Sequence, residues 1–305
     1  MELIMSGKKQ KSIREQIEKN FEHLDSSLDH PIWANPMTRF DTQLPAVKAP
    51  DDFARELSKF LNSQQEANIS PFYNYLISGK LPLEGVQEWA RQFYFDVRCF
   101  PTTVAQIVAN ANYQYDIRQV YGLNLVEELG ELMPTKEHPI LFMKVGRALG
   151  LKNEEMEYVN PIPEVLVAIE YRLKLMKELN VVEAVAAGSF AVEGAIMQRY
   201  RLIAKTLKEV YGVSEDALEF FYVHTGEKLA SGYGGDAHHI AESLNFIKKY
   251  ATTAESQERV RQAVWRSVEA RKCTHWGLFR HIVLKNDKSY NDLLKTTAEI
   301  GKKSA

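Results

Sequence analysis

The chain has 305 residues, 45% of which are hydrophobic, and its formal net charge at pH 7 is −2. This length suits one large domain or two small ones with a buried core. The near-neutral charge gives no electrostatic reason to expect binding to nucleic acid or to an anionic membrane. The two cysteines, Cys99 and Cys273, provide neither a disulfide framework nor a zinc motif, which is typical of a reducing cytoplasm. The first residues lack an apolar signal-peptide core, and no run approaches the ~18 apolar residues of a membrane span, so we expect a cytoplasmic protein outside the membrane.

Residues 1–50 are the least regular part of the sequence. Residues 12–24 are compatible with a helix, whereas residues 29–50 hold four prolines and no periodic pattern of apolar residues. We interpret residues 1–50 as an N-terminal arm that wraps over the rest or contributes to a dimer contact. Residues 51–305 are then a single helical domain.

From residue 51 onward, apolar residues recur at spacings of three and four and not in strict alternation, which predicts helices and no strand. Ser70 and Pro71 form a helix-start signal, Gly79 is a helix-end signal, and Pro101 predicts a kink within a long helix. The expected helices cover residues 50–65, 70–79, 82–111, 116–130, 138–150, 163–179, 181–210, 214–230, 236–251 and 254–284. The sequence therefore predicts an all-α bundle of about eight to ten helices.

Three carboxylates and three imidazoles lie on or beside these apolar segments, namely Glu128, His138, Glu193, His224, Asp236 and His239. Glu193 interrupts the apolar run "AVAAGSFAVEGAIM" with no lysine or arginine in it, and a buried carboxylate is costly unless a positive group pairs with it. Asp236 and His239 are three residues apart, so they share one face of a helix. Carboxylates and imidazoles that project inward from facing helices are typical ligands of iron in helical bundles. The pattern indicates an enzyme built around iron, and six ligands suit two metal ions.

Each of these residues also has an ordinary structural interpretation. Glu128 belongs to an acidic patch at a helix end, and such residues are usually solvated. His138 precedes a proline and can cap the following helix, while His224 can be a core histidine. The histidine pair at 238–239 can lie on the surface, and a glutamate inside a helix, such as Glu193, often points to solvent.

The order and spacing of these residues resemble those of the haem-oxygenase-like di-iron oxidases. This helical superfamily also holds pyrroloquinoline-quinone synthase and the chlamydial protein that associates with death domains. The resemblance covers roughly residues 65–285 and rests on the segments "WARQFYFDVRCFPTTVAQIVANA", "NLVEELGELMPTKEHPILFMKVGRALGL", "FAVEGAI", "LEFFYVH" and "DAHH". It implies a haem-oxygenase-like bundle with an N-terminal extension, a homodimer, and two Fe²⁺ ions per chain held by Glu128, His138, Glu193, His224, Asp236 and His239.

One departure from the family pattern affects the last two ligands. Family members usually place the aspartate four residues after the histidine on one continuous helix, whereas here the eleven residues "TGEKLASGYGG" separate His224 from Asp236. We interpret them as an insertion that breaks the helix before the ligand face resumes, since their glycines permit a bulge. The alternative is that the second iron site is altered or lost, in which case His238 replaces His239 or the site holds one metal.

The resemblance implies that two ferrous ions activate dioxygen to oxidise a small organic substrate. The substrate would be an amine, an amino acid or a fatty acid, and the outcome N-oxygenation, C–C cleavage, desaturation or decarboxylation. Arg98 is a candidate to hold a substrate carboxylate as a bidentate fork. The candidate substrate contacts, all on the helices that carry the ligands, are Tyr94, Arg98, Phe190, Gln198 and Tyr222.

Three other functions are compatible with parts of the sequence. A metal-free oxidase similar to pyrroloquinoline-quinone synthase would bind a cofactor-like substrate, but the acidic residues at the metal positions argue against it. A non-enzymatic helical interaction protein would not need Glu193 in an apolar run. Haem oxygenase proper would need an axial histidine early in the chain, where only His23 and His30 are available.

Overall fold

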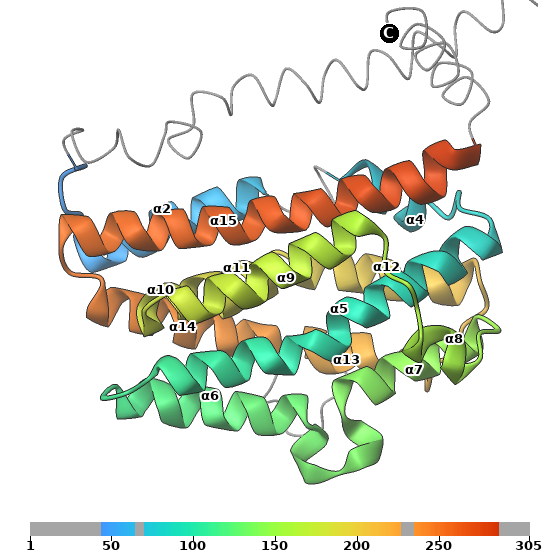
Figure 1. The fold of residues 1–305 in the computed structure, drawn as a ribbon, viewed down its shortest axis with the longest axis horizontal. Coiled ribbons are helices and arrows are strands. Elements are labelled where there is room, and N and C mark those ends of the chain that lie inside the picture. Colours follow the sequence, from blue (N-terminus) through green and yellow to red (C-terminus); the bar gives the residue numbers. More distant parts are fainter. Residues whose placement is uncertain (1–43, 65–69, 227–234, 287–305) are drawn as a thin grey trace, which may run out of the picture. The chain divides into compact units, whose positions relative to one another are not determined.

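The computed structural model describes residues 44–64, 70–226 and 235–286, and residues 46–286 belong to one compact unit. Within the described ranges the chain forms helices joined by short loops and contains no strand (Figure 1). The all-α prediction is confirmed. Most of the predicted N-terminal arm, including His23 and His30, lies outside the described residues.

The first half of the bundle follows the predicted helices closely. Ser70 caps its helix as expected, since its side-chain oxygen accepts a hydrogen bond from the backbone of Tyr73 at 3.2 Å. The long helix continues through Pro101. The elements are α2 (Pro50–Ser63), α4 (Pro71–Ile77), α5 (Leu83–Asn110), α6 (Tyr115–Glu128), the 3₁₀ turns η2 (Gly130–Leu132) and η3 (Pro134–Lys136), α7 (His138–Ala148), α8 (Asn153–Glu157) and α9 (Pro163–Glu178).

The second half departs from uniform α-helix at two places. The stretch predicted as one helix over 181–210 is interrupted, since a π-helical turn precedes Glu193 and the three turn residues 194–196 follow it. The stretch predicted over 214–230 is helical only from Glu219 to Thr225 among the described residues. The elements are α10 (Val181–Val185), the π-helical turn η4 (Ala186–Phe190), α11 (Ala191–Glu193), α12 (Met197–Glu209), α13 (Glu219–Thr225), α14 (Asp236–Tyr250), α15 (Ala254–Leu278), the π-helical turn η5 (Phe279–Val283) and the 3₁₀ turn η6 (Leu284–Asn286).

The change of geometry around Glu193 is stabilised by side chains of α15. Ser267 donates a hydrogen bond to the carbonyl of Ala187 at 2.7 Å, and Arg271 donates to the carbonyls of Val192, at 2.7 Å, and Ala191. A side chain that inserts into the helical hydrogen-bond ladder is a common cause of a kink, and π-helical turns often occur at functional sites. The π-helical turn η4, which lies just before Glu193, therefore suggests a functional site near Glu193.

Two apolar clusters hold the helices together. One packs α5 and α6 against α9, α10 and η4, and the other packs α2 against η4, α14 and α15. In Figure 1, α9 lies between α15 and α5, and both helices contact it. The turn η4 contributes to both clusters, so Glu193, which follows it, lies deep inside the bundle.

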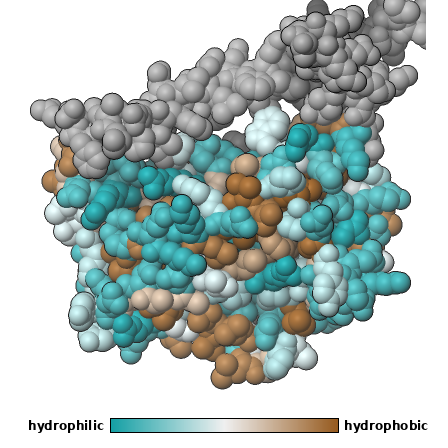
Figure 2. Space-filling model, viewed as in Figure 1, coloured by the Kyte–Doolittle hydropathy of each residue, from teal (hydrophilic) through white to brown (hydrophobic). Residues whose placement is uncertain are grey.

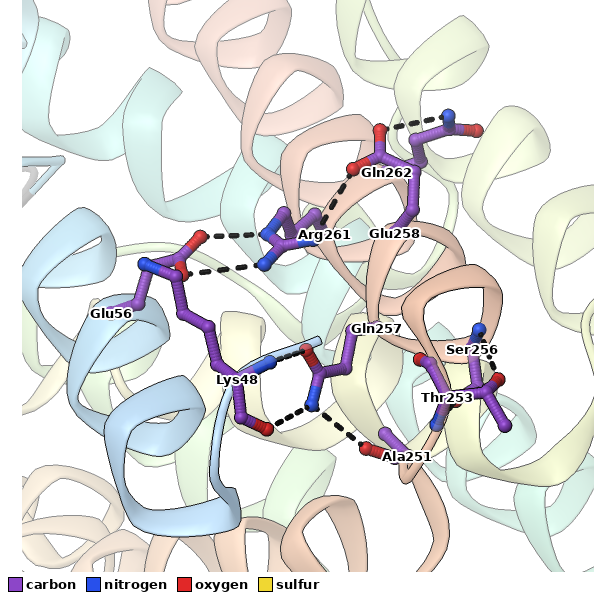
Figure 3. A network of polar contacts seen from close by, with 9 residues as sticks. All are labelled: Lys48, Glu56, Ala251, Thr253, Ser256, Gln257, Glu258, Arg261 and Gln262. Atoms are coloured by element: carbon purple, nitrogen blue, oxygen red, sulfur yellow. Dashed lines mark hydrogen bonds and ion pairs between the residues drawn. The ribbon is translucent and has the colours of Figure 1, made fainter. Parts of the chain in front are cut away.

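A polar network fastens the segment before α2 to the start of α15 (Figure 3). The backbone of Lys48 donates to the side-chain oxygen of Gln257 at 2.9 Å, and the side-chain nitrogen of Gln257 donates back to the carbonyl of Lys48 at 2.8 Å. Glu56 on α2 accepts from Arg261 on α15 at 2.7 Å. These contacts fix α2 on the outside of α14 and α15.

One stretch of the described residues, Val181–Glu209, is long and apolar enough to cross a membrane. However, 78% of its most apolar window is buried inside the structure, as expected for the core helix of a globular bundle. On the face in Figure 2, hydrophobic residues are interspersed with hydrophilic ones. The apolarity of this stretch is therefore accounted for by the protein core.

Candidate metal centre

The structure brings the six predicted metal ligands together in two groups of three. Within each group, one nitrogen or oxygen atom of every member lies within 4.8 Å of the others. Five of the six line one cavity of about 60 Å³, measured as the space open to the centre of a water molecule. The first group is Glu128, His138 and His224, and the second is Glu193, Asp236 and His239.

The first group depends on a tight loop between α6 and α7. Glu128 is the last residue of α6 and His138 the first of α7. Gly130, Glu131 and Leu132 between them all have positive φ, at 68°, 53° and 67°. A Cβ on Gly130 would lie 2.4 Å from the backbone nitrogen of Glu137, so only glycine fits there. The loop returns the chain so that His138 Nδ1 lies 2.9 Å from a carboxylate oxygen of Glu128.

The first pair is held as an ion pair in the absence of a metal. Burial raises the pKa of Glu128, but the opposing charge of His138 and its contact with the carboxylate lower that pKa below its ordinary value overall. Burial likewise lowers the pKa of His138, and the charge of Glu128 outweighs this effect and raises the pKa. The two groups stabilise each other's charged form.

His224 completes the first group from α13. Its Nδ1 atom lies 2.7 Å from the carbonyl oxygen of Phe220, which assigns the ring proton to Nδ1 because a carbonyl can only accept. Nε2 is then a neutral imidazole nitrogen with a lone pair, the form in which histidine binds metals. Burial, followed by the nearby charge of His138, lowers the pKa of His224 to about 3, so the ring is neutral at pH 7.

The second group contains two buried carboxylates. The side chains of Glu193 and Asp236 are almost fully buried, and both oxygens of Glu193 and Oδ2 of Asp236 have no hydrogen-bond partner among the described residues. Burial, followed by the charge of Glu193, raises the pKa of Asp236 well above its ordinary value. Two carboxylates in one dry site repel each other, and a bound cation removes both that repulsion and the cost of their unsatisfied oxygens. The donor set of carboxylate oxygens and imidazole nitrogens fits iron.

His239 lies between two carboxylates. Its Nδ1 atom is 3.3 Å from Glu193, and its Nε2 atom donates a hydrogen bond of 2.9 Å to Glu127. Burial lowers the pKa of His239, but the hydrogen bond to Glu127 and the nearby carboxylate of Glu193 outweigh it and raise the pKa to about 11. The carbonyl of His239 accepts a hydrogen bond of 2.7 Å from Ser243, which in turn contacts Tyr121 at 2.8 Å. The ring and its backbone are thus both held in place.

The structure also answers how the chain passes from His224 to Asp236. The helix α13 ends at Thr225, and α14 begins at Asp236 after Gly235, which has φ of 90°. A Cβ on Gly235 would lie 2.9 Å from the backbone nitrogen of Gly226 and 3.0 Å from the carbonyl oxygen of His224. The end of α13 and the start of α14 therefore lie against each other, although eleven residues separate His224 from Asp236 in the sequence. Asp236 and His239 face Glu193, whereas His238 is exposed and belongs to neither group.

The five residues expected to contact substrate do not line the cavity. The exposed Arg98 donates to the backbone carbonyl of Glu157 at 2.8 Å, and Tyr222 donates to Glu215 on the surface. Phe190 belongs to the apolar cluster between α2 and α15. Tyr94 is buried but absent from the cavity wall, and Gln198 is exposed.

The rest of the cavity lining is built from residues that the sequence did not indicate. It carries three arginines and one aspartate together with aromatic rings and a histidine. The polar members are Asp96, Arg172, Arg199, Arg271, His275, Tyr73 and Tyr200. In the sequence, each of these residues looks like an ordinary polar residue of an amphipathic helix. Only the fold shows that they line one cavity.

Comparisons with known proteins agree with this fold. A family model described as "iron-containing redox enzyme" matches residues 87–272, more than half of the chain. A 4-aminobenzoate synthase from Nitrosomonas europaea is 26% identical over 235 residues, covering 73% of this chain and 89% of the relative. A pyrroloquinoline-quinone synthase from Xanthomonas oryzae is 25% identical over 231 residues, covering 72% and 84%.

Solved structures with the same fold include a haem-oxygenase-like domain from Shewanella denitrificans. Its TM-score is 0.62 at 15% identity, and the match covers 78% of this chain and 94% of that one. A protein from Nostoc punctiforme described as CADD-like has a TM-score of 0.63 at 14% identity, covering 77% and 98%. The predicted haem-oxygenase-like bundle is confirmed.

Proposed function

Since the chain belongs to the family of iron-containing redox enzymes, we propose that it binds two iron ions, one at each group of ligands, and uses dioxygen to oxidise a small organic substrate. The observation that carries the proposal is the second group, where three buried carboxylate oxygens of Glu193 and Asp236 have no hydrogen-bond partner among the described residues. A fold keeps such costly groups when a cation satisfies them.

The protein's own residues would supply ligation, orientation and a dry reaction space. Iron held there would provide the redox chemistry of dioxygen activation. Glu128, Glu193 and Asp236 would neutralise the cations, and the hydrogen bonds from His224 to Phe220 and from His239 to Glu127 would fix the two rings. Tyr200 and Phe220 line the cavity and pack against the ring of His224, with centroids 5.3 and 4.5 Å away. Burial raises the pKa of Tyr200, so its hydroxyl keeps its proton and can donate a hydrogen bond in the cavity.

The test is iron binding followed by turnover. The full chain is reconstituted with ferrous iron without oxygen, its iron content is measured, and Mössbauer spectra are recorded before and after oxygen is added with a panel of amines, amino acids and fatty acids. We expect about two iron ions per chain and a spectrum that changes with oxygen at a rate that one class of compound increases. A measured content well below one iron ion per chain would overturn the proposal and favour the metal-free oxidase. The similarity to relatives named pyrroloquinoline-quinone synthase is the reason to keep that alternative.

Two other expectations remain predictions. We expect a homodimer, which light scattering of the purified chain measures directly. We also expect a cytoplasmic location, which fractionation of the source cells tests.

A further inference from the structure

Three guanidinium groups line the cavity that holds the candidate metal ligands, and their part of the lining is called the arginine wall here. Arg172 comes from α9, Arg199 from α12 and Arg271 from α15, and all three line the cavity. The residues Arg172 and Arg199 are only 6% and 3% exposed. Buried arginines at the wall of a cavity are unusual, because a guanidinium loses its hydration there.

Each arginine is held in a defined position. Arg172 contacts Asp96 at 2.6 Å, and Arg271 donates to two carbonyls of α11 beside Glu193. The guanidinium of Arg199 lies over the ring of Tyr73, 4.4 Å from its centroid. The wall is therefore pre-organised, which lowers the entropic cost of binding a ligand to it.

The arginines outnumber the carboxylates that remain once metal ions are bound. Four carboxylates line the cavity, and three of them, Glu128, Glu193 and Asp236, are candidate metal ligands. Only Asp96 is then left on the cavity wall against three guanidinium groups, an excess of two positive charges. The charged groups also affect one another. Burial lowers the pKa of Arg271, the charge of Asp96 raises it and the charge of Arg172 lowers it, and the result is a pKa of about 10. A bound anion would relieve the repulsion among the three guanidinium groups.

We propose that this wall binds the carboxylate group of the organic substrate, with Arg199 as its main donor and Arg172 and Arg271 adding positive charge. A guanidinium fork matches the two oxygens of a carboxylate, and such charge-assisted pairs are the strongest hydrogen bonds that side chains form. The inference rests on the proposed function and narrows its substrate class. It places the carboxylate on the arginine wall and the reacting part of the molecule towards the two groups of metal ligands.

The size and lining of the cavity limit the rest of the substrate. The volume of about 60 Å³ that is open to the centres of water molecules has room for roughly four to six of them. The rest of the cavity lining is largely aromatic and apolar, with Phe93, Phe100 and Phe220 among its residues. A small carboxylic acid, such as an amino acid or an aromatic acid, fits this space better than a long-chain fatty acid.

The test compares acids with their uncharged amides. The full chain is loaded with Zn²⁺, a redox-inactive ion that accepts the same donor types, and its metal content is measured. Calorimetric titrations at pH 7 then use benzoate against benzamide and pentanoate against pentanamide. We expect at least one acid to bind tenfold or more tightly than its amide. Arg199→Gln should weaken binding of that acid at least tenfold, and Arg199→Lys should weaken it less, because the charge remains but the fork is lost.

Arg98→Gln is the matched control, since it removes an arginine from the exposed face of α5 and should leave the acid affinity unchanged. Equal affinity for acid and amide in the unmodified, metal-loaded chain would overturn the inference even when the Arg199 variants do not fold. So would a folded Arg199→Gln variant that binds the acid as the unmodified chain does, because the acid would then be held by the metal alone. Neither of these results would contradict the proposed metal centre. A chain that binds no metal, in contrast, would overturn both the proposed function and this inference.

Discussion

His239 donates a hydrogen bond of 2.9 Å from Nε2 to the carboxylate of Glu127, while Nδ1 on the other side of the ring faces Glu193. A carboxylate behind a metal-binding histidine fixes the tautomer and orientation of the ring and increases its basicity as a ligand. Glu127 is half exposed and belongs to neither group of candidate ligands. Its position assigns it the role of orienting His239.

Glu127→Gln is therefore expected to weaken metal binding. The glutamine keeps an oxygen that can accept from Nε2 but loses the negative charge, and loss of such a partner typically costs 10- to 100-fold in metal affinity. Chelator competition with ferrous or zinc ions measures the affinity. Glu131→Gln removes another glutamate from the same acidic patch, at an exposed position outside both groups, and should bind metal as the unmodified chain does. Equal affinities for the two variants would show that Glu127 does not orient the ring.

We expect Glu193 to destabilise the metal-free protein and to be required for full iron binding. Its two oxygens are buried without hydrogen-bond partners among the described residues, and its charge raises the pKa of Asp236. Glu193→Gln should raise the free energy of unfolding of the metal-free chain by about 1 to 3 kcal/mol, because relief of the repulsion between two buried carboxylates outweighs the loss of the 3.3 Å contact with His239, which keeps Glu127 as an anionic partner. The same variant should hold fewer iron ions per chain after reconstitution. Urea denaturation and iron analysis give the two results.

Glu183→Gln is the control for this substitution. Glu183 is also buried, but Arg259 lies 3.1 Å from its carboxylate. Glu183 has an arginine partner and belongs to neither group of candidate ligands, so its replacement should leave the stability unchanged or lower it, and metal binding should be normal. A metal-free Glu193→Gln chain that unfolds more easily than the unmodified chain, with its iron content intact, would show a structural role for Glu193.

The fold and the ligand positions were largely predictable because both follow from local rules. Apolar spacing of three and four gave the helices, and Ser70 with Pro71 marked a helix start that the structure confirms. Glu193 was conspicuous because its neighbours in sequence are apolar. Asp236 and His239 were paired by their spacing of three, which needs no knowledge of the tertiary structure beyond the helix itself.

The arginine wall was not predictable because it depends on how each helix is rotated about its axis. Successive residues of an α-helix differ by about 100° in direction, so Phe93 and Asp96 on α5 face the cavity while Tyr94 and Arg98 do not. Arg199 and Arg271 are sequence-distant basic residues in polar surroundings, and only the packing of α12 and α15 brings them to one wall. The change of helix geometry before Glu193 likewise depends on Ser267 and Arg271, which follow it by more than 70 residues.

Gly235→Ala should disturb the second group of ligands. The backbone of Gly235 has φ of 90°, and a Cβ there would approach backbone atoms of Gly226 and His224 that cannot move easily. We expect the free energy of unfolding to fall by about 1 to 3 kcal/mol and binding of the second metal ion to weaken, because Asp236 would be displaced. Gly212→Ala is a matched control, since Gly212 has φ of 69° but a Cβ added to it would meet nothing within 4 Å. If both variants lose the same stability and bind metal equally, the contact with Gly226 is unimportant.

Glu219 should make the stability of the site depend on pH. It joins α13 to α7 and the loop before it, because Lys144 donates to its carboxylate at 2.7 Å and Lys136 pairs with it as well. Burial raises the pKa of Glu219, but the hydrogen bonds from Lys136 and Lys144 outweigh this effect and lower the pKa below its ordinary value of 4.5. A carboxyl group with a lowered pKa in the folded state stabilises the fold above its unfolded pKa, and this contribution disappears as the pH falls through the folded value.

Glu219→Gln should therefore be less stable than the unmodified chain at pH 7, by up to about 1 kcal/mol, and equally stable at a pH below the folded pKa of Glu219. Thermal unfolding followed by circular dichroism, in steps from about pH 7 down to about pH 3, measures the convergence. Glu170→Gln alters an exposed glutamate on α9 and should track the unmodified chain at every pH. A difference between the Glu219 variant and the unmodified chain that stays constant as the pH falls would mean that the carboxylate contributes nothing through its charge, and that α7 and α13 are held together by their apolar contacts alone.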